Sequence, residues 1–158
     1  MFMRKTIEEG LSFGLTSGVI TTIGLMVGLD AATSSKLAVA GGIISIAVAD
    51  SLSDALGVHT LEETNKEKRK HVWESTFSTF IAKFLFTLTF FIPLLLFDLQ
   101  TAILVSIMLG LLLLTILSYR VAKATKENPL RVICIHVSLA IVVIVLANYV
   151  GKLVAVYF

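Results

Sequence analysis

Two aspartates, Asp50 and Asp54, lie four residues apart inside a long apolar stretch of the sequence. On a helix this spacing places both carboxylates on one face, one turn apart. A charged side chain in the hydrocarbon core of a membrane costs at least ~2.5 kcal/mol, so such residues face the protein interior and need a partner. One interpretation is a structural ion pair with Lys83, which lies in another apolar stretch and would be costly to bury unpaired.

The other interpretation is a cation site built from the same two carboxylates. Ser17 and Thr21 would supply facing hydroxyl oxygens from an earlier apolar stretch. Hard oxygen ligands suit Mn²⁺ and tolerate Fe²⁺, and protonation of the carboxylates would release the metal. Ser51, Ser53 and His136 are placed at a similar depth, and for His136 we expect a hydrogen-bonded packing role rather than metal ligation. The two interpretations are compatible, because Lys83 could hold one aspartate while the other binds the cation.

Five apolar segments must position these residues, and each is about as long as a membrane-spanning helix. They are residues 7–29, 37–58, 77–97, 102–119 and 130–156. The chain has 158 residues, of which 56% are hydrophobic and only 15% are charged, with a mean hydropathy of +0.93. A soluble domain usually carries about 25% charged residues. The sequence therefore predicts one all-α transmembrane domain, a bundle of five helices, with no room for a soluble enzyme domain.

The basic residues are unevenly distributed between the predicted loops. Ten of them fall on one side: Arg4, Lys5, Lys66, Lys68, Arg69, Lys70, Arg120, Lys123, Lys126 and Arg131. Lys36 and Lys152 fall on the other side. The positive-inside rule then places the N-terminus in the cytoplasm and the C-terminus outside. We expect an integral multi-pass membrane protein, in the cell membrane if the organism is prokaryotic, with no nucleic-acid partner at a net charge of +2.

The predicted cytoplasmic loop, residues 59–73, is rich in charge. Its acids Glu62, Glu63 and Glu67 accompany the histidines His59 and His71. The favoured interpretation is a solvated helical extension of the second span with Glu–Lys pairs along it. The alternative is weak metal capture at the entrance of a transport path.

Glycines recur every four residues in the first span. Gly10, Gly14 and Gly18 form one set, and Gly24 and Gly28 form a second. Lipid offers no hydrophobic force to pair helices, so stripes of small residues allow the close approach that packing needs. We expect these glycines to pack helices together, within the chain or between subunits. The second span carries another small face, formed by Gly41, Gly42, Ser45, Ala49 and Ser53.

Four segments resemble, in order, the signatures of the vacuolar iron transporter family. GLTSGVITTIGLMVGL at residues 14–29 is similar to its first-span signature, and GGIISIAVADSLSDALG at 41–57 to its small-residue second span. IPLLLF at 92–97 resembles the end of its third span, and NPLRVICIHVSLAIVVIVLANYVGKL at 128–153 its fifth span. The resemblance covers nearly the whole chain, with the same number of spans and the same orientation.

The resemblance implies a homodimer of five-helix subunits that exchanges Fe²⁺ or Mn²⁺ for protons, moves the metal out of the cytoplasm and holds no permanent cofactor. The family's first-span acid matches Ser17, its second-span methionine matches Asp54, and its glutamate near the end of the second span matches Val58. Two acids of the family are therefore missing, and one acid stands where the family has a soft ligand. The family's long cytoplasmic metal-binding helices are reduced to the segment 59–73.

The sequence thus predicts a proton-coupled divalent-cation transporter and not an enzyme, since no Ser, His or Cys set is arranged for catalysis. Asp54 would be the central ligand and proton carrier, with Asp50 as its partner. One alternative is a membrane scaffold or partner-binding subunit that keeps the fold with a structural Asp–Lys ion pair. Another is a transporter of a different, organic substrate with Lys83 as a fixed charge.

Overall fold

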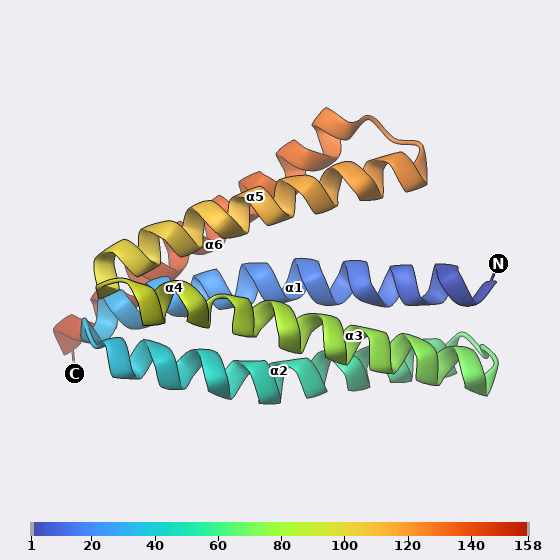
Figure 1. Cartoon of the computed structure of the whole chain (residues 1–158), viewed down its shortest axis with the longest axis horizontal. Coiled ribbons are helices and arrows are strands. Elements are labelled where there is room, and N and C mark those ends of the chain that lie inside the picture. Colours follow the sequence, from blue (N-terminus) through green and yellow to red (C-terminus); the bar gives the residue numbers. More distant parts are fainter. Residues whose placement is uncertain (1, 158) are drawn as a thin grey trace.

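The computed structural model describes the backbone of residues 2–157 and the side chains of residues 10–157. Every regular element in this part of the chain is a helix. The helices are α1 (Phe2–Thr33), α2 (Lys36–Thr64), α3 (Arg69–Thr89), α4 (Phe91–Leu96), α5 (Leu99–Thr125) and α6 (Pro129–Tyr157). Figure 1 shows α1, α2 and α3 side by side, with α5 and α6 as a hairpin that diverges from them, and the chain ends at opposite ends of the bundle.

Five membrane-spanning segments are present in the described residues, as the sequence predicts. By length and composition they are Gly10–Thr33, Lys36–Thr64, Arg69–Leu96, Leu99–Thr125 and Pro129–Tyr157. The helices are longer than the apolar segments that the sequence predicts. Most of the predicted loop 59–73 is helical, because α2 continues to Thr64 and α3 begins at Arg69, which leaves only residues 65–68 between them.

Local sequence signals set the ends of several helices. The Ser35 side chain accepts a hydrogen bond from the Ala38 backbone N–H at 3.2 Å and so begins α2. Asp98 caps α5 in the same way, accepting from the Thr101 N–H at 3.1 Å. Pro129 is the first residue of α6, where its missing N–H has no intrahelical partner to lose.

Pro93 explains the break between α3 and α4. A proline ring removes one backbone hydrogen bond and clashes with the carbonyl four residues earlier, which here belongs to Thr89. Helix α3 ends at Thr89, and α4 begins at Phe91. The third span is thus completed by a short helix after a break, as the position of the proline predicts.

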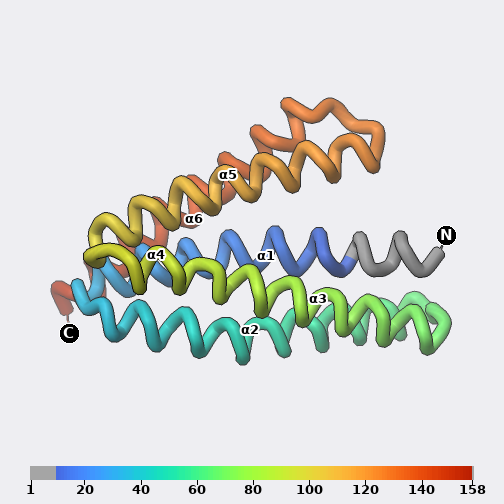
Figure 2. Tube along the Cα trace, viewed as in Figure 1, coloured from blue at the N-terminus to red at the C-terminus, as the bar shows by residue number. Residues whose placement is uncertain are grey.

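The glycines of α1 face two different helices, one set in each half of α1. A Cβ at Gly14 would lie 2.7 Å from the Thr79 carbonyl oxygen of α3, and Gly10 and Gly18 also face α3. A Cβ at Gly24 would lie 2.8 Å from Val143 Cγ1 of α6, and Gly28 also faces α6. Both stripes therefore pack helices within one chain. The trace in Figure 2 shows the result: α1 runs along α3, and the α5–α6 hairpin separates from α1 toward the turn that joins α5 to α6.

Helix α3 has a polar buried face and an apolar exposed one. Ser75, Thr79, Lys83 and Thr87 are all buried, and they recur every four residues. The exposed face carries large apolar side chains: Trp73, Phe77, Ile81 and Leu85. In a bilayer this arrangement places apolar groups against lipid and polar groups against α1 and α2.

Candidate cation site

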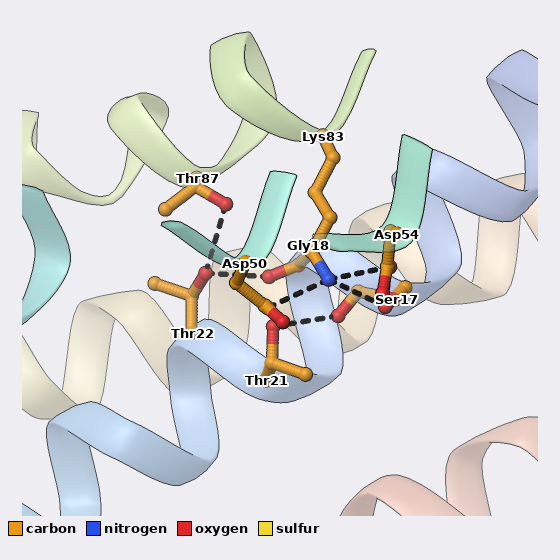
Figure 3. A network of polar contacts seen from close by, with 8 residues as sticks. All are labelled: Ser17, Gly18, Thr21, Thr22, Asp50, Asp54, Lys83 and Thr87. Carbon is orange, nitrogen blue, oxygen red and sulfur yellow. Dashed lines mark hydrogen bonds and ion pairs between the residues drawn. The ribbon is translucent and has the colours of Figure 1, made fainter. Parts of the chain in front are cut away.

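Lys83 is the centre of the polar layer between α1, α2 and α3. Its side chain is 0% exposed, and its Nζ lies 2.6 Å from Asp50 Oδ2 and 2.5 Å from Asp54 Oδ2. The four-residue spacing of the aspartates on α2 places both carboxylates on the face that meets α3. Figure 3 shows the ammonium group between the two acids. The structure therefore brings together all three charged residues that the sequence singles out.

Ser17 of α1 completes this cluster. Its hydroxyl donates a hydrogen bond to Asp54 Oδ2 at 2.7 Å and accepts one from Lys83 Nζ at 2.9 Å (Figure 3). Lys83, Ser17 and Asp54 thus form a closed ring of contacts contributed by three helices. We call Ser17, Asp50, Asp54 and Lys83 the charged cluster.

Thr21 and Thr22 extend the polar layer by one turn of α1. The Thr21 hydroxyl donates to the Ser17 carbonyl at 2.9 Å, so its proton is held by its own helix. The Thr22 hydroxyl donates to the Gly18 carbonyl at 2.5 Å and lies 3.3 Å from Thr87 Oγ1 of α3. Thr21 therefore contributes no bond to the aspartates, although its oxygen keeps lone pairs for a cation.

The charges of the cluster do not cancel. Counted at the formal charges of ionised side chains, two carboxylates and one ammonium leave one negative charge, and Ser17 adds none. The aspartates are not sealed from their surroundings, since the side chains of Asp50 and Asp54 are 31% and 21% exposed. Asp50 Oδ2 meets the distance of an ion pair with Lys83 but makes no hydrogen bond of acceptable geometry. The cluster can accept a further positive charge.

The described residues contain no ready-made metal centre. Nowhere among them do three His, Cys, Asp or Glu side chains come together closely enough to hold a metal ion. Lys83 Nζ lies where a cation shared by Asp50 and Asp54 would have to sit. A metal could therefore bind between these carboxylates only after the ammonium moves.

The acids Glu62, Glu63 and Glu67, for which weak metal capture is the alternative prediction, lie apart from the charged cluster. They belong to the last turns of α2 and to the turn that follows it. Glu63 Oε1 lies 3.4 Å from His59 Nε2, and Glu62 Oε2 lies 3.6 Å from His71 Nε2. The structure thus divides the predicted cation-binding residues into an intramembrane group and a group at the α2–α3 turn.

His136 is in neither group. Its Nδ1 lies 2.8 Å from Ser118 Oγ. This contact joins α6 to α5 inside the hairpin. This contact fits the packing role expected for it. Sequence reasoning missed Ser118 and the Thr22–Thr87 contact, although the four-residue repeat of polar residues in α3 is a signal that could have drawn attention to Thr87.

Comparison with family models, with curated proteins and with solved structures gave no match for this chain.

Proposed function

We propose that this protein is a membrane transporter for a divalent transition-metal cation, Fe²⁺ or Mn²⁺, that moves the cation out of the cytoplasm in exchange for protons. The observation that carries the proposal is the uncompensated negative charge of the charged cluster. Intramembrane ionisable groups are costly, and they mark ion pathways and proton relays more often than simple structure. The oxygen-only ligand set of Asp50, Asp54 and Ser17 suits a hard divalent cation.

In this proposal the cation and Lys83 compete for the same place. A divalent ion between Asp50 and Asp54 neutralises both carboxylates and leaves the Lys83 ammonium without a counter-ion. Carboxylates must be deprotonated to hold a metal, so a proton taken up by Asp50 or Asp54 would displace the cation. Binding of the cation would therefore release a proton, and departure of the cation would take one up. This gives exchange for protons without any further group.

The proposal includes a homodimer that packs through α2. Five small residues recur every four positions on its exposed face: Gly41, Ser45, Ala49, Ser53 and Gly57. A Cβ at Gly41 or at Gly57 would have no atom within 4 Å, so this face is open along its length. Small residues at this spacing support close packing of membrane helices. A second copy on this face would lie beside Asp50 and Asp54, which directly follow Ala49 and Ser53 in the sequence.

A second candidate function is a membrane scaffold without transport activity. The complete burial of Lys83 and its contacts with three partners favour it, because a permanent ion pair of this kind can fix helix packing. In this case a permanently bound proton would balance the remaining negative charge of the charged cluster.

Metal flux into or out of reconstituted vesicles under an imposed pH gradient separates the two candidates. The transporter proposal expects Fe²⁺ or Mn²⁺ flux that follows the gradient and is abolished by Asp54→Asn. Asp30→Asn is the matched control, because Asp30 is bonded to Gln100 and lies outside the charged cluster. If the parent protein moves neither metal at any gradient, the transporter proposal is wrong and the scaffold is favoured.

A further inference from the structure

A groove of about 510 Å³ runs along the exposed face of α3, beside α1. Its apolar walls are formed by Leu11 of α1 and by Trp73, Phe77 and Ile81 of α3. All four side chains are exposed. The volume falls within the roughly 300–1,000 Å³ of small-molecule sites. The described part of the chain therefore leaves an apolar binding surface open between these two helices.

The charged groups of this groove lie at the end where α3 begins. Lys70 stands there with its side chain 77% exposed, and its Nζ lies 3.7 Å from Oε1 of Glu74, which is 23% exposed. Ser78 also lines the groove, but its hydroxyl donates to the Ser75 carbonyl of its own helix at 3.0 Å. The groove thus has a charged mouth, formed by Lys70 and Glu74, and an apolar interior.

The length of the groove corresponds to one leaflet of a bilayer. The eleven positions from Lys70 to Ile81 advance ~16 Å along α3, at 1.5 Å per residue. This is about half of the roughly 30 Å thickness of the hydrocarbon core. Trp73 lies one turn from Lys70, and tryptophan is enriched at the depth of the lipid headgroups. An acyl chain of the leaflet at the α2–α3 turn would therefore run along the groove, with its headgroup at the mouth.

The charges around the mouth favour an anionic headgroup. Lys68, Arg69 and Lys70 follow one another where α3 begins, and the first turn of that helix contains no acid. Basic residues are unfavourable beside the positive end of a helix dipole, and a nearby anion would offset this. Glu74 is the one acid among the described residues of the lining, and its ion pair with Lys70 is partly exposed, so it contributes little. A lipid phosphate can therefore reach the Lys70 ammonium without breaking a strong contact.

We propose that the groove binds one anionic phospholipid of the leaflet at the α2–α3 turn, with its acyl chain against Trp73 and Phe77 and its phosphate beside Lys70. Basic residues next to a transmembrane helix attract anionic headgroups, with a gain in affinity of about five-fold for each residue. Trp73 stacks on Phe77, with 5.6 Å between the ring centres, and this pair gives the acyl chain a continuous aromatic wall. The lipid site uses no residue of the charged cluster and does not rest on the proposed transport function.

Trp73 provides the measurement, because it is the only tryptophan in the chain. Bromine atoms on an acyl chain quench the fluorescence of a tryptophan that they touch. The full-length protein is reconstituted into mixed vesicles of phosphatidylcholine and phosphatidylglycerol, and one of the two lipids at a time is brominated in the upper part of its chain. We expect a relative binding constant of about five in favour of phosphatidylglycerol. This preference should decrease at high salt, because ions screen the lysine charge.

Three substitutions show whether the preference belongs to this groove. Lys70→Gln should bring the relative binding constant close to one. Lys123→Gln is the matched control and should change nothing, because it removes the same charge from α5, which does not line the groove but ends on the same side of the bundle (Figure 1). Glu74→Gln should raise the preference, since it removes the acid that competes with the phosphate for Lys70. Lys70→Gln and Glu74→Gln both abolish the Lys70–Glu74 pair, so opposite effects distinguish a headgroup contact from the loss of that pair.

Four outcomes would overturn the lipid site. Equal quenching by the two brominated lipids would mean that Trp73 meets ordinary bilayer lipid. Equal losses in Lys70→Gln and Lys123→Gln would make the preference a property of the whole surface. Quenching by neither lipid would mean that a protein surface, such as a second copy of the chain, covers the groove. Displacement of brominated phosphatidylglycerol by inorganic phosphate, added in place of chloride at equal ionic strength, would make the mouth a site for free phosphate.

Discussion

Gly18 and Lys83 are in direct contact across the α1–α3 interface. A Cβ at Gly18 would lie 3.3 Å from Lys83 Cγ and 3.4 Å from the Lys83 carbonyl oxygen. The absence of a side chain at this position of α1 therefore gives the lysine room to extend toward the two aspartates. Helix packing and the charged cluster depend on the same glycine.

Gly18→Ala is expected to shift Lys83 and to reduce stability. A Cβ at this distance requires Lys83 to move by a few tenths of an ångström, so we expect a loss near the lower end of the roughly 1–3 kcal/mol that overpacking costs. Thermal unfolding of the solubilised protein measures this, with Gly28→Ala as the control, because a Cβ at Gly28 would meet only Ala147, at 3.5 Å or more. Equal effects of the two substitutions would show that the contact with Lys83 is not tight.

Lys83→Met is expected to be strongly destabilising, because it leaves Asp50 and Asp54 without their counter-ion. Loss of one partner from a buried ion pair costs about 3–5 kcal/mol. Combining it with Asp50→Asn should recover part of the loss, which a double-mutant cycle on unfolding free energies measures. Strict additivity of the two substitutions would mean that Lys83 and Asp50 do not interact.

Asp98 should make the start of α5 sensitive to acid. Hydrogen bonds from the Thr101 backbone and side chain hold the pKa of Asp98 below its ordinary value. A lowered pKa in the folded state stabilises the protein above the unfolded pKa of about 3.9, and this contribution disappears as the pH falls through the folded value. Asp98→Asn keeps a capping oxygen without a titrating group, so melting temperatures measured from pH 6 down to pH 2 should fall less steeply than in the parent. If the melting temperatures of both proteins fall equally steeply with pH, Asp98 is not the source of the acid sensitivity.

The orientation can be tested with single cysteines, because Cys134 is the only one in the chain. In a Cys134→Ser background, Asn65→Cys lies in the α2–α3 turn, and Gln100→Cys lies at the opposite end in the first turn of α5. An impermeant maleimide added outside intact cells should label Gln100→Cys and spare Asn65→Cys, in agreement with the positive-inside rule. The opposite pattern would invert the orientation and place the α2–α3 turn outside.

The architecture follows from the sequence because span length, apolar composition and the position of Pro93 are local properties. The pairing of Lys83 with an aspartate is one of the two interpretations that the sequence allows, since an unpaired intramembrane lysine is so unfavourable. The sequence does not show that one ammonium contacts both Asp50 and Asp54, because this depends on the rotation of α2 about its axis. It also does not reveal the contact between His59 Nδ1 and Thr76 Oγ1, because the two residues lie seventeen positions apart on different helices.

Helix α1 is fastened to two different neighbours, by Gly10, Gly14 and Gly18 to α3 and by Gly24 and Gly28 to α6. Ser17 lies on the first of these halves and holds Asp54. The α5–α6 hairpin and the oxygen atoms around Lys83 are therefore connected through a single helix, whose one half contacts α6 and whose other half supplies the serine.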